Sequence, residues 1–135
     1  MPDMQRTLRL RTGARVELVD LTARVAEVVA AAGVADGLCT VFARHTTTAI
    51  IVNEVADTAL QIDIPTAMER LVPEGLWAHD RVDGNGAAHL KATILGTAKA
   101  IPVRGGRLVL GTWQGIALVE FDGPQSREIV VDVRA

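Results

Sequence analysis

The chain has 135 residues, a formal net charge of −2 at pH 7, and a composition of 49% hydrophobic, 22% charged and 3% aromatic residues. This balance predicts a single globular domain, residues 1–135, with an aliphatic core. The weak negative charge and the scarcity of aromatic side chains argue against nucleic acid as the main partner. No apolar run approaches membrane-spanning length, so we expect no membrane partner.

The first third of the sequence predicts strands around one helix. Residues 7–12 alternate as a half-exposed strand, and Gly13-Ala14 can turn the chain into a second strand at 15–19, which predicts a hairpin. Asp20 can cap a helix whose apolar side runs from Leu21 to Ala32 before Gly33 ends it. We expect this helix to pack on a sheet.

The rest of the chain predicts two helices followed by strands. Residues 56–71 have helical periodicity, but Pro65 removes a backbone donor, so we expect a break or kink near Ile64. A shorter helix is predicted at 87–95, with Asn85 as its cap. Further strands are predicted at 98–103, 107–110, 116–121 and 126–133. Together these elements predict an α+β fold, mainly an antiparallel β-sandwich with two or three helices packed on the sheets.

The single cysteine, Cys39, excludes an internal disulfide and suits a reducing compartment, so we expect a cytoplasmic protein. Cys39 shares a strand face with Val41 and Ala43. That position favours apolar packing over a role as nucleophile.

A polar segment, residues 44–48, separates two β-branched runs and contains no Gly, Pro, Asn or Asp. Because surface turns favour those four residues, the segment is interpreted as the lining of a site between two sheet segments. Its histidine, His45, has two counterparts, His79 and His89, in a second polar stretch. The three could bind a divalent metal, could form an acid–base and hydrogen-bonding cluster around an anionic ligand, or could be structurally unrelated.

Other polar residues also allow two interpretations each. Arg44, Thr46 and Thr47 could bind phosphate or carboxylate, or could belong to a threonine-rich strand. Glu54 is either a general base or a carboxylate favoured by the start of a helix. Trp113 and Gln114 could form a ligand wall or a packing contact. Arg127 is either a buried anion ligand or a surface charge, and its local sequence favours the surface.

Five segments in order resemble the YjbQ-like family, whose members are also described as secondary thiamine-phosphate synthases. The segments are Phe42-Ala43-Arg44-His45-Thr46-Thr47, Val52-Asn53-Glu54, Asn85-Gly86-Ala87-Ala88-His89-Leu90-Lys91, Leu110-Gly111-Thr112-Trp113-Gln114 and Phe121-Asp122-Gly123-Pro124. The resemblance implies a homotrimer and one pocket that contains the polar residues His45, Glu54, His79, Asn85, His89, Gln114 and Arg127. The sequence departs from the family pattern at Thr48, an extra threonine, and at Gln125, where the family usually has arginine.

The residue chemistry and the resemblance together suggest roles for individual residues. Candidate catalytic residues are His45, Glu54, Asn85 and His89, and candidate ligand or phosphate-binding residues are Arg44, Thr46, Thr47, Gln114 and Arg127. A divalent metal, Zn²⁺ or Mg²⁺, would be held by His45, His79 and His89. Lys91 would add positive charge for a leaving diphosphate, and Asp80 or Asp83 could join Glu54 at Mg²⁺.

These observations predict a small enzyme that acts on a phosphorylated or otherwise anionic metabolite. Its secondary activity would be transfer of a pyrimidine methyl group from its diphosphate to thiazole phosphate. The alternative is a non-catalytic homotrimer that binds a small anionic metabolite.

Overall fold

The structure is a computed structural model that describes residues 3–135. This part of the chain forms eight strands, three α-helices and one 3₁₀ helix. In chain order they are β1 (Met4–Arg11), β2 (Glu17–Asp20), α1 (Thr22–Ala32), β3 (Asp36–Ala43), β4 (Thr48–Asn53), α2 (Thr58–Leu71), the 3₁₀ helix η1 (Ala78–Arg81), α3 (Gly86–Leu95), β5 (Ala98–Arg104), β6 (Arg107–Leu108), β7 (Gly115–Glu120) and β8 (Ser126–Arg134).

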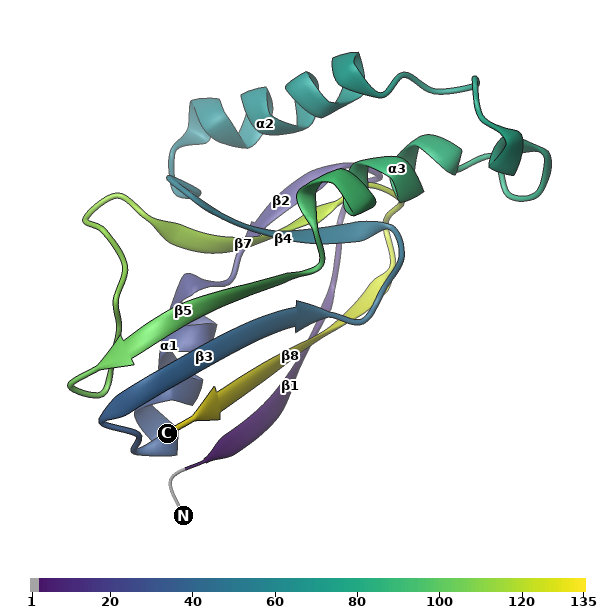
Figure 1. The fold of residues 1–135 in the computed structure, drawn as a ribbon. Helices are drawn as coiled ribbons and strands as arrows, with labels where there is room; N and C mark the ends of the chain where they lie inside the picture. Colours follow the sequence, from purple (N-terminus) through teal and green to yellow (C-terminus); the bar gives the residue numbers. More distant parts are fainter. Residues whose placement is uncertain (1–2) are drawn as a thin grey trace.

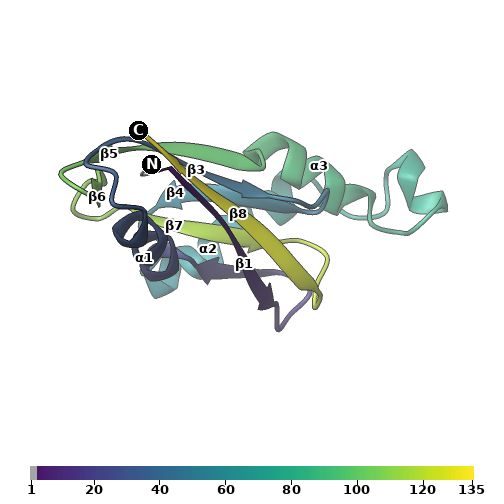
Figure 2. The ribbon, with the colours of Figure 1, turned by 90° about the horizontal axis from the view of Figure 1, so that it is seen from below.

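The strands form two antiparallel sheets. The larger sheet has the order β1-β8-β3-β5-β6, and the smaller has the order β2-β7-β4. The helices α2 and α3 lie over the smaller sheet, whereas α1 lies near both chain ends (Figures 1 and 2). The predicted α+β fold of antiparallel sheets with packed helices is confirmed.

Strand β7 separates the two hydrophobic clusters of the core. Its side chains alternate between the faces of the smaller sheet, so Ile116 and Leu118 join the cluster with α1 and the larger sheet. Ala117 and Val119 join the second cluster, under α2 and α3. Because both faces are covered, every residue of β7 is buried and the strand has an almost continuous apolar sequence.

The predicted first helix is confirmed as α1. Asp20 accepts a hydrogen bond from the backbone N–H of Thr22 at 2.9 Å, and Gly33 ends the helix with a left-handed φ of 68°. Its apolar side packs into the larger cluster, where Cys39 is also fully buried. Burial raises the pKa of the Cys39 thiol to about 11, which suits apolar packing and not nucleophilic chemistry.

The predicted hairpin of the first two strands is wrong. Strand β1 pairs with β8 in the larger sheet, and β2 pairs with β7 in the smaller sheet. Between them, Thr12 donates its backbone N–H to the carbonyl of Gln125 at 2.9 Å, and Gly123 donates its N–H to the carbonyl of Arg15 at 2.9 Å. These bonds carry the chain from one sheet to the other in place of a hairpin turn.

Of the break or kink predicted near Ile64, the break is absent, because α2 is one helix that includes Pro65. Its proline ring is buried, so packing offsets the missing backbone hydrogen bond. Asp57 caps the start of the helix by accepting the N–H of Leu60 at 2.9 Å. Within residues 3–135, no helix combines the length and the apolar character needed to cross a membrane.

Candidate functional site

The polar segment 44–47 connects the two sheets, as its position between two apolar runs predicts. It leaves β3 in the larger sheet and enters β4 in the smaller one. Arg44 donates its backbone N–H to the carbonyl of Glu128 at 3.2 Å, and the carbonyl of Thr47 accepts the N–H of Phe121 at 3.1 Å. Main-chain bonds therefore fix both ends of the segment.

A buried ion pair lies directly beside this connection. Glu120 is completely buried and Arg127 is 4% exposed. The guanidinium binds the carboxylate through two nitrogens, Nε at 2.8 Å and Nη2 at 2.6 Å, and Nη2 also donates to the hydroxyl of Thr47 at 3.0 Å. The carboxylate accepts further bonds from the hydroxyl of Thr12 at 2.7 Å and the N–H of Asp122 at 3.2 Å. Of the two interpretations of Arg127, the structure therefore supports the buried one and not the surface position that the local sequence favours.

These contacts decide the charge of Glu120. Burial raises the pKa of its carboxyl, but hydrogen bonds from Arg127, Thr12 and the backbone of Asp122 outweigh burial and bring the pKa below its ordinary value of 4.5. Glu120 therefore carries its charge at neutral pH and holds Arg127 in place. The remaining guanidinium nitrogen, Nη1, has no hydrogen-bond partner among residues 3–135 and is not enclosed.

Two adjoining cavities lie where the connection meets α3, and we call them together the histidine cleft. Four residues line both cavities: Arg44, His45, Thr46 and His89. The first cavity, of about 560 Å³, is completed by Phe42, Ala43, Ala92, Thr93 and Thr97. The second, of about 390 Å³, is completed by Thr47, Asp83, Asn85, Asp122, Gln125 and Arg127. The cleft thus has a largely apolar half and a polar half.

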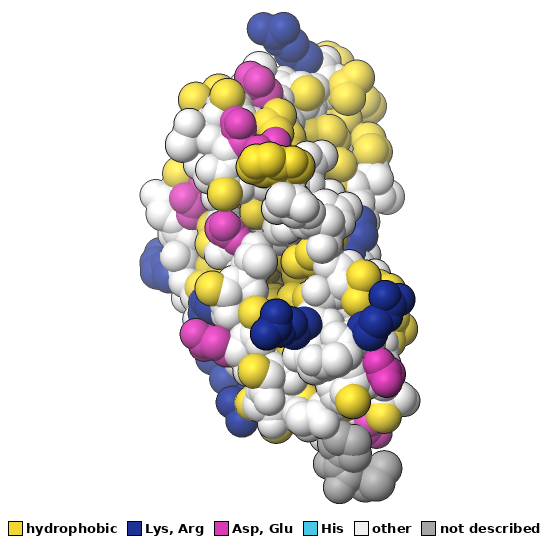
Figure 3. Space-filling model, turned by 90° about the vertical axis from the view of Figure 1, so that its left-hand side faces the viewer, with side chains coloured by type: hydrophobic (Ala, Val, Ile, Leu, Met, Phe, Trp, Pro, Cys, Tyr) yellow, Lys and Arg dark blue, Asp and Glu magenta, His cyan; other side chains and the backbone are white. Residues whose placement is uncertain are grey.

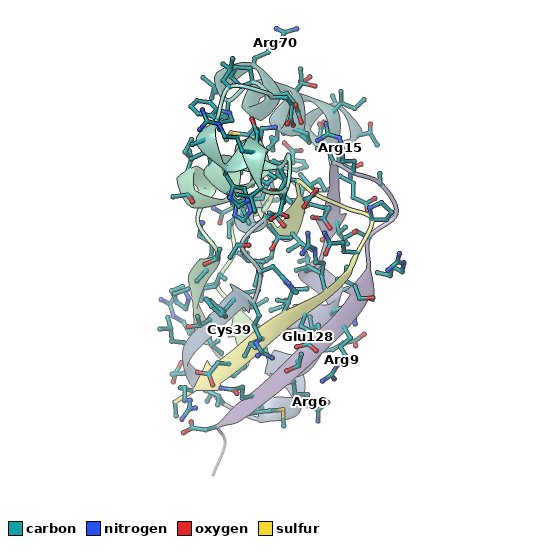
Figure 4. All side chains as sticks on the ribbon, turned by 90° about the vertical axis from the view of Figure 1, so that its right-hand side faces the viewer. Arg6, Arg9, Arg15, Cys39, Arg70 and Glu128 are labelled. Carbon is teal, nitrogen blue, oxygen red and sulfur yellow. The ribbon has the colours of Figure 1, made fainter. Side chains whose placement is uncertain are left out.

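His45 lies at the boundary of the two halves. Its Nε2 accepts the backbone N–H of Glu128 at 2.8 Å. Burial and the nearby positive charge of Arg127 lower the pKa of the imidazole below its ordinary value of 6.5, against the opposing effect of Glu120. His45 is therefore neutral at pH 7. Glu128 itself is held by its ion pairs with Arg44 at 2.9 Å and Arg9 at 3.5 Å, and Figure 4 shows Arg9 beside it on the neighbouring strand.

His89 and His79 lie against each other. Their ring centroids are 4.4 Å apart with an interplanar angle of 69°. His79 Nε2 also lies 3.5 Å from a carboxylate oxygen of Asp83. Because His89 lines both cavities with His45, the structure brings the three histidines to one end of the molecule.

The wall that carries His89 is fixed mainly by Asp80. Its carboxylate accepts the backbone N–H of Trp77 at 3.0 Å and that of Gly86 at 2.8 Å, and these two bonds lower the pKa of Asp80. Asp80 thus caps α3 in place of Asn85, which makes no side-chain cap bond. Asn85 instead donates its amide to the carboxylate of Asp122 at 2.8 Å.

Glu54 and Gln114 do not line the histidine cleft. They lie in a separate cavity of about 330 Å³, which we call the tryptophan cleft, and Gln114 accepts the N–H of Gly111 there at 2.8 Å. Trp113 in this cleft is 73% exposed and is not a packing device of the core. The tryptophan cleft is lined by Asp20, Thr22, Glu54, Val55, Ala56, Asp57, Thr112, Trp113, Gln114 and Gly115.

Lys91 also lies outside the histidine cleft. It is completely buried under α2, where its Nζ is 3.0 Å from Glu69 and 3.7 Å from Glu74. The ammonium lies 5.7 Å from the ring centroid of Phe121. These contacts connect α3 to α2, so Lys91 stabilises the fold and does not face the cleft.

Of the predicted site residues, the structure gathers most but not all at one place. The histidine cleft contains Arg44, His45, Thr46, Thr47, Asn85, His89 and Arg127. His79 contacts this group through His89, whereas Glu54 and Gln114 do not contribute to it. Glu120 and Asp122 are functional candidates that were not predicted from the sequence. The available signal for Glu120 was a carboxylate that ends an otherwise apolar strand, where burial without a cationic partner would be costly.

Among residues 3–135, no three His, Cys, Asp or Glu side chains converge as a group that could hold a metal ion. The Zn²⁺ or Mg²⁺ site at His45, His79 and His89 therefore stays a prediction from the sequence.

Comparison with known proteins identifies the family. The family described as UPF0047 protein YjbQ-like matches residues 6–135. The chain belongs to this family. A UPF0047 protein of Archaeoglobus fulgidus is 48% identical over 92% of this chain and 96% of its own length. The YugU protein of Bacillus subtilis is 37% identical over 92% of this chain and 94% of its own length.

Solved structures of similar chains have the same fold. A protein of unknown function from Sulfolobus solfataricus is 41% identical, has a TM-score of 0.94, and is matched over 97% of this chain and 96% of its own. A hypothetical protein from Aeropyrum pernix is also 41% identical with a TM-score of 0.94, and the match covers 98% of each chain. These relatives establish the family and the fold, and they assign no activity.

The ion pair predicts a large effect of substitution at Arg127. Arg127→Met leaves the Glu120 carboxylate buried without its cation, which should lower the free energy of unfolding by about 3–5 kcal/mol. Urea denaturation measures the change. Arg134→Met, on the same strand but 58% exposed, should cost less than about 1 kcal/mol. Equal effects of the two substitutions would contradict the role assigned to the pair.

The pKa of Glu120 predicts how the ion pair responds to acid. Because the folded-state pKa lies below 4.5, the carboxylate stabilises the fold fully above that pH and loses this contribution as pH falls through the folded-state pKa. The stability difference between the parent and Glu120→Gln should therefore be constant near neutrality and shrink below pH 4.5. Urea titrations at several pH values test this, with exposed Glu27→Gln as the control. A difference that grows towards acid pH would refute the expectation.

Proposed function

We propose that the histidine cleft binds a small phosphorylated or otherwise anionic metabolite, and that the chain is an enzyme acting on it. The observation that carries the proposal is that Arg127, which lines the polar half of the cleft, has one guanidinium nitrogen, Nη1, with no hydrogen-bond partner among residues 3–135. Glu120 satisfies the other side of the guanidinium, so the remaining donor is held in a fixed direction. A charged donor held without rearrangement favours an anion such as phosphate.

The two halves of the cleft suggest the shape of the ligand. Phosphate or carboxylate would lie in the polar half near Arg127 and Arg44. The body of the ligand would contact Phe42, Ala43 and Ala92 in the other half. His89 borders both halves, so it is the candidate for proton transfer at the junction of body and anionic group.

A thiamine-phosphate synthase-like transfer suits this ligand class. In that reaction the bond between the pyrimidine methyl group and its diphosphate breaks, diphosphate leaves, and the thiazole nitrogen forms the new bond. The cleft would have to neutralise the charge of the leaving group, for which Arg127 and Arg44 are the candidates, and exclude water. The sequence lacks a paired-aspartate motif for binding a diphosphate through Mg²⁺. We therefore propose this transfer as a secondary activity.

Inorganic pyrophosphate tests the binding proposal without knowledge of the substrate. Pyrophosphate should raise the melting temperature of the untagged protein in a buffer that contains a chelator, because a ligand that binds only the folded state stabilises that state. Arg44→Ala and His89→Ala should each weaken binding about tenfold, since each removes a candidate hydrogen bond to a charged group.

The matched control is Arg107→Ala, which removes an exposed arginine on β6. If the melting temperature of the parent does not change at a high concentration of pyrophosphate, the binding proposal is refuted. Metal analysis of untagged preparations that have been kept free of chelator addresses the alternative chemistry. About one transition-metal ion per chain in the parent and none in His89→Ala would favour a metal site over direct anion binding.

A second candidate function is a non-catalytic homotrimer that binds the metabolite. The observation that favours an assembly is the separation of Glu54 and Gln114 from the histidine cleft within one chain. The two clefts differ in charge, since arginines and aspartates together line the histidine cleft, whereas the charged residues of the tryptophan cleft, Asp20, Glu54 and Asp57, are all acidic. A ring of chains can join two different surfaces of this kind. Apolar side chains are exposed on the face that Figure 3 shows, mainly in its upper part at the level of α2.

The assembly predicts a mass three times that of the 14.4 kDa chain in sedimentation equilibrium. Trp113→Ser should shift the mass towards one chain, because it removes an exposed aromatic side chain at the proposed interface. Leu38→Ser, at the far end of β3 from the cleft, is the control. A monomeric parent would exclude the trimer while leaving the binding proposal intact.

A further inference from the structure

The hydrogen bond between His45 and Glu128 determines which nitrogen of the imidazole carries the proton. A backbone amide can only donate, so Nε2, at 2.8 Å from the nitrogen of Glu128, must present its lone pair. A neutral imidazole has one N–H group, which leaves the proton on Nδ1. Turning the ring over would place a C–H group against the amide and lose the bond.

The amide that imposes this arrangement is itself held firmly. Glu128 lies in β8, where its backbone pairs with Arg9 of β1, and its carbonyl accepts the N–H of Arg44. The side chain of Glu128 binds Arg44 at 2.9 Å. His45 thus takes the place of the next acceptor beyond the end of the β3–β8 ladder, which pairs as far as Ala43.

Nδ1 of His45 has no hydrogen-bond partner among residues 3–135 and is not an enclosed atom. His45 lines both halves of the cleft, next to Arg44 and Thr46. The free N–H is therefore accessible to a bound molecule.

We propose that the main-chain N–H of Glu128 holds His45 as the Nδ1–H tautomer, and that His45 donates this hydrogen to a phosphate or carboxylate oxygen of the ligand. The ligand part of the proposal rests on the proposed function, whereas the tautomer does not. Glu128 acts here as a positioning residue through its backbone.

The tautomer excludes two roles that the sequence allows. A histidine that binds a metal offers a lone pair to the ion and donates its other N–H to an acceptor. In His45 the lone pair is already used by an amide donor, and the free nitrogen carries the proton. For the same reason His45 cannot accept a proton as a general base in this arrangement. His45 therefore does not fit the metal site predicted with His79 and His89.

Nuclear magnetic resonance tests the tautomer directly. Long-range ¹H–¹⁵N spectra of histidine-labelled protein at neutral pH distinguish Nδ1–H from Nε2–H imidazoles, and His79→Gln and His45→Gln assign the signals. We expect the Nδ1–H pattern for His45, with its nitrogen signals shifting on addition of inorganic phosphate. An Nε2–H pattern or a doubly protonated ring would overturn the proposal.

Two substitutions separate the nitrogens. Glutamine can place an oxygen near the position of Nε2, so His45→Gln should keep the acceptor for Glu128 and the urea midpoint of the parent. It should bind phosphate about tenfold or more weakly, because the donor is lost. Asparagine can place an N–H near the position of Nδ1, so His45→Asn should unfold at lower urea but bind phosphate more tightly than His45→Gln.

The reverse order of the two affinities would overturn the donor role. Failure of the proposed function can be told apart from failure of the tautomer assignment. If phosphate does not bind the parent at all, the anion proposal fails, and the tautomer pattern in the spectra still decides the assignment of His45.

Discussion

The buried pair of Glu120 and Arg127 connects three of the six places where the chain passes between the sheets. Thr12 on the first crossing donates to the carboxylate, Thr47 on the second accepts from the guanidinium, and the pair itself borders the third, residues 121–125. Two charges removed from water need all of these partners, because each unsatisfied group would cost several kcal/mol. The same requirement holds the backbone segments that carry Thr12, Thr47 and Asp122 in place. The ion pair therefore forms a rigid floor of the cleft, and one guanidinium nitrogen of Arg127 remains without a partner among residues 3–135.

The sequence predicts local structure better than pairing. The strands and α1 follow from alternation, apolar periodicity and the terminating Gly33, all of which are properties of neighbouring residues. Strand partners are chosen by residues far along the chain, and this is why the expected hairpin of β1 and β2 is wrong. The local sequence of Arg127 favours a surface position for the same reason. Its local pattern suits a surface strand, and only the fold brings Glu120 to it.

The candidate site shows the same division. His45, Thr46 and Thr47 are neighbours in sequence and remain together, and α3 adds Asn85 and His89 because they lie one turn apart. Glu54 follows the same polar segment by only a few residues, but an extended strand intervenes. The six residues of β4 span about 20 Å, so Glu54 emerges at the opposite end of the smaller sheet. A residue that is close in sequence to the polar segment can therefore lie far from it in space when a strand separates the two.

This distance links catalysis to assembly. The ion pair of Glu120 and Arg127 fixes one end of β4. The strand cannot bend enough to bring Glu54 back to the cleft without breaking its pairing with β7. No reorientation of the Glu54 side chain covers about 20 Å either. If a carboxylate at position 54 takes part in the chemistry beside His45 and His89, it must come from another copy of the chain. A monomer would then retain anion binding through Arg127 and His45 but would lack the carboxylate, so binding and turnover would depend differently on oligomeric state.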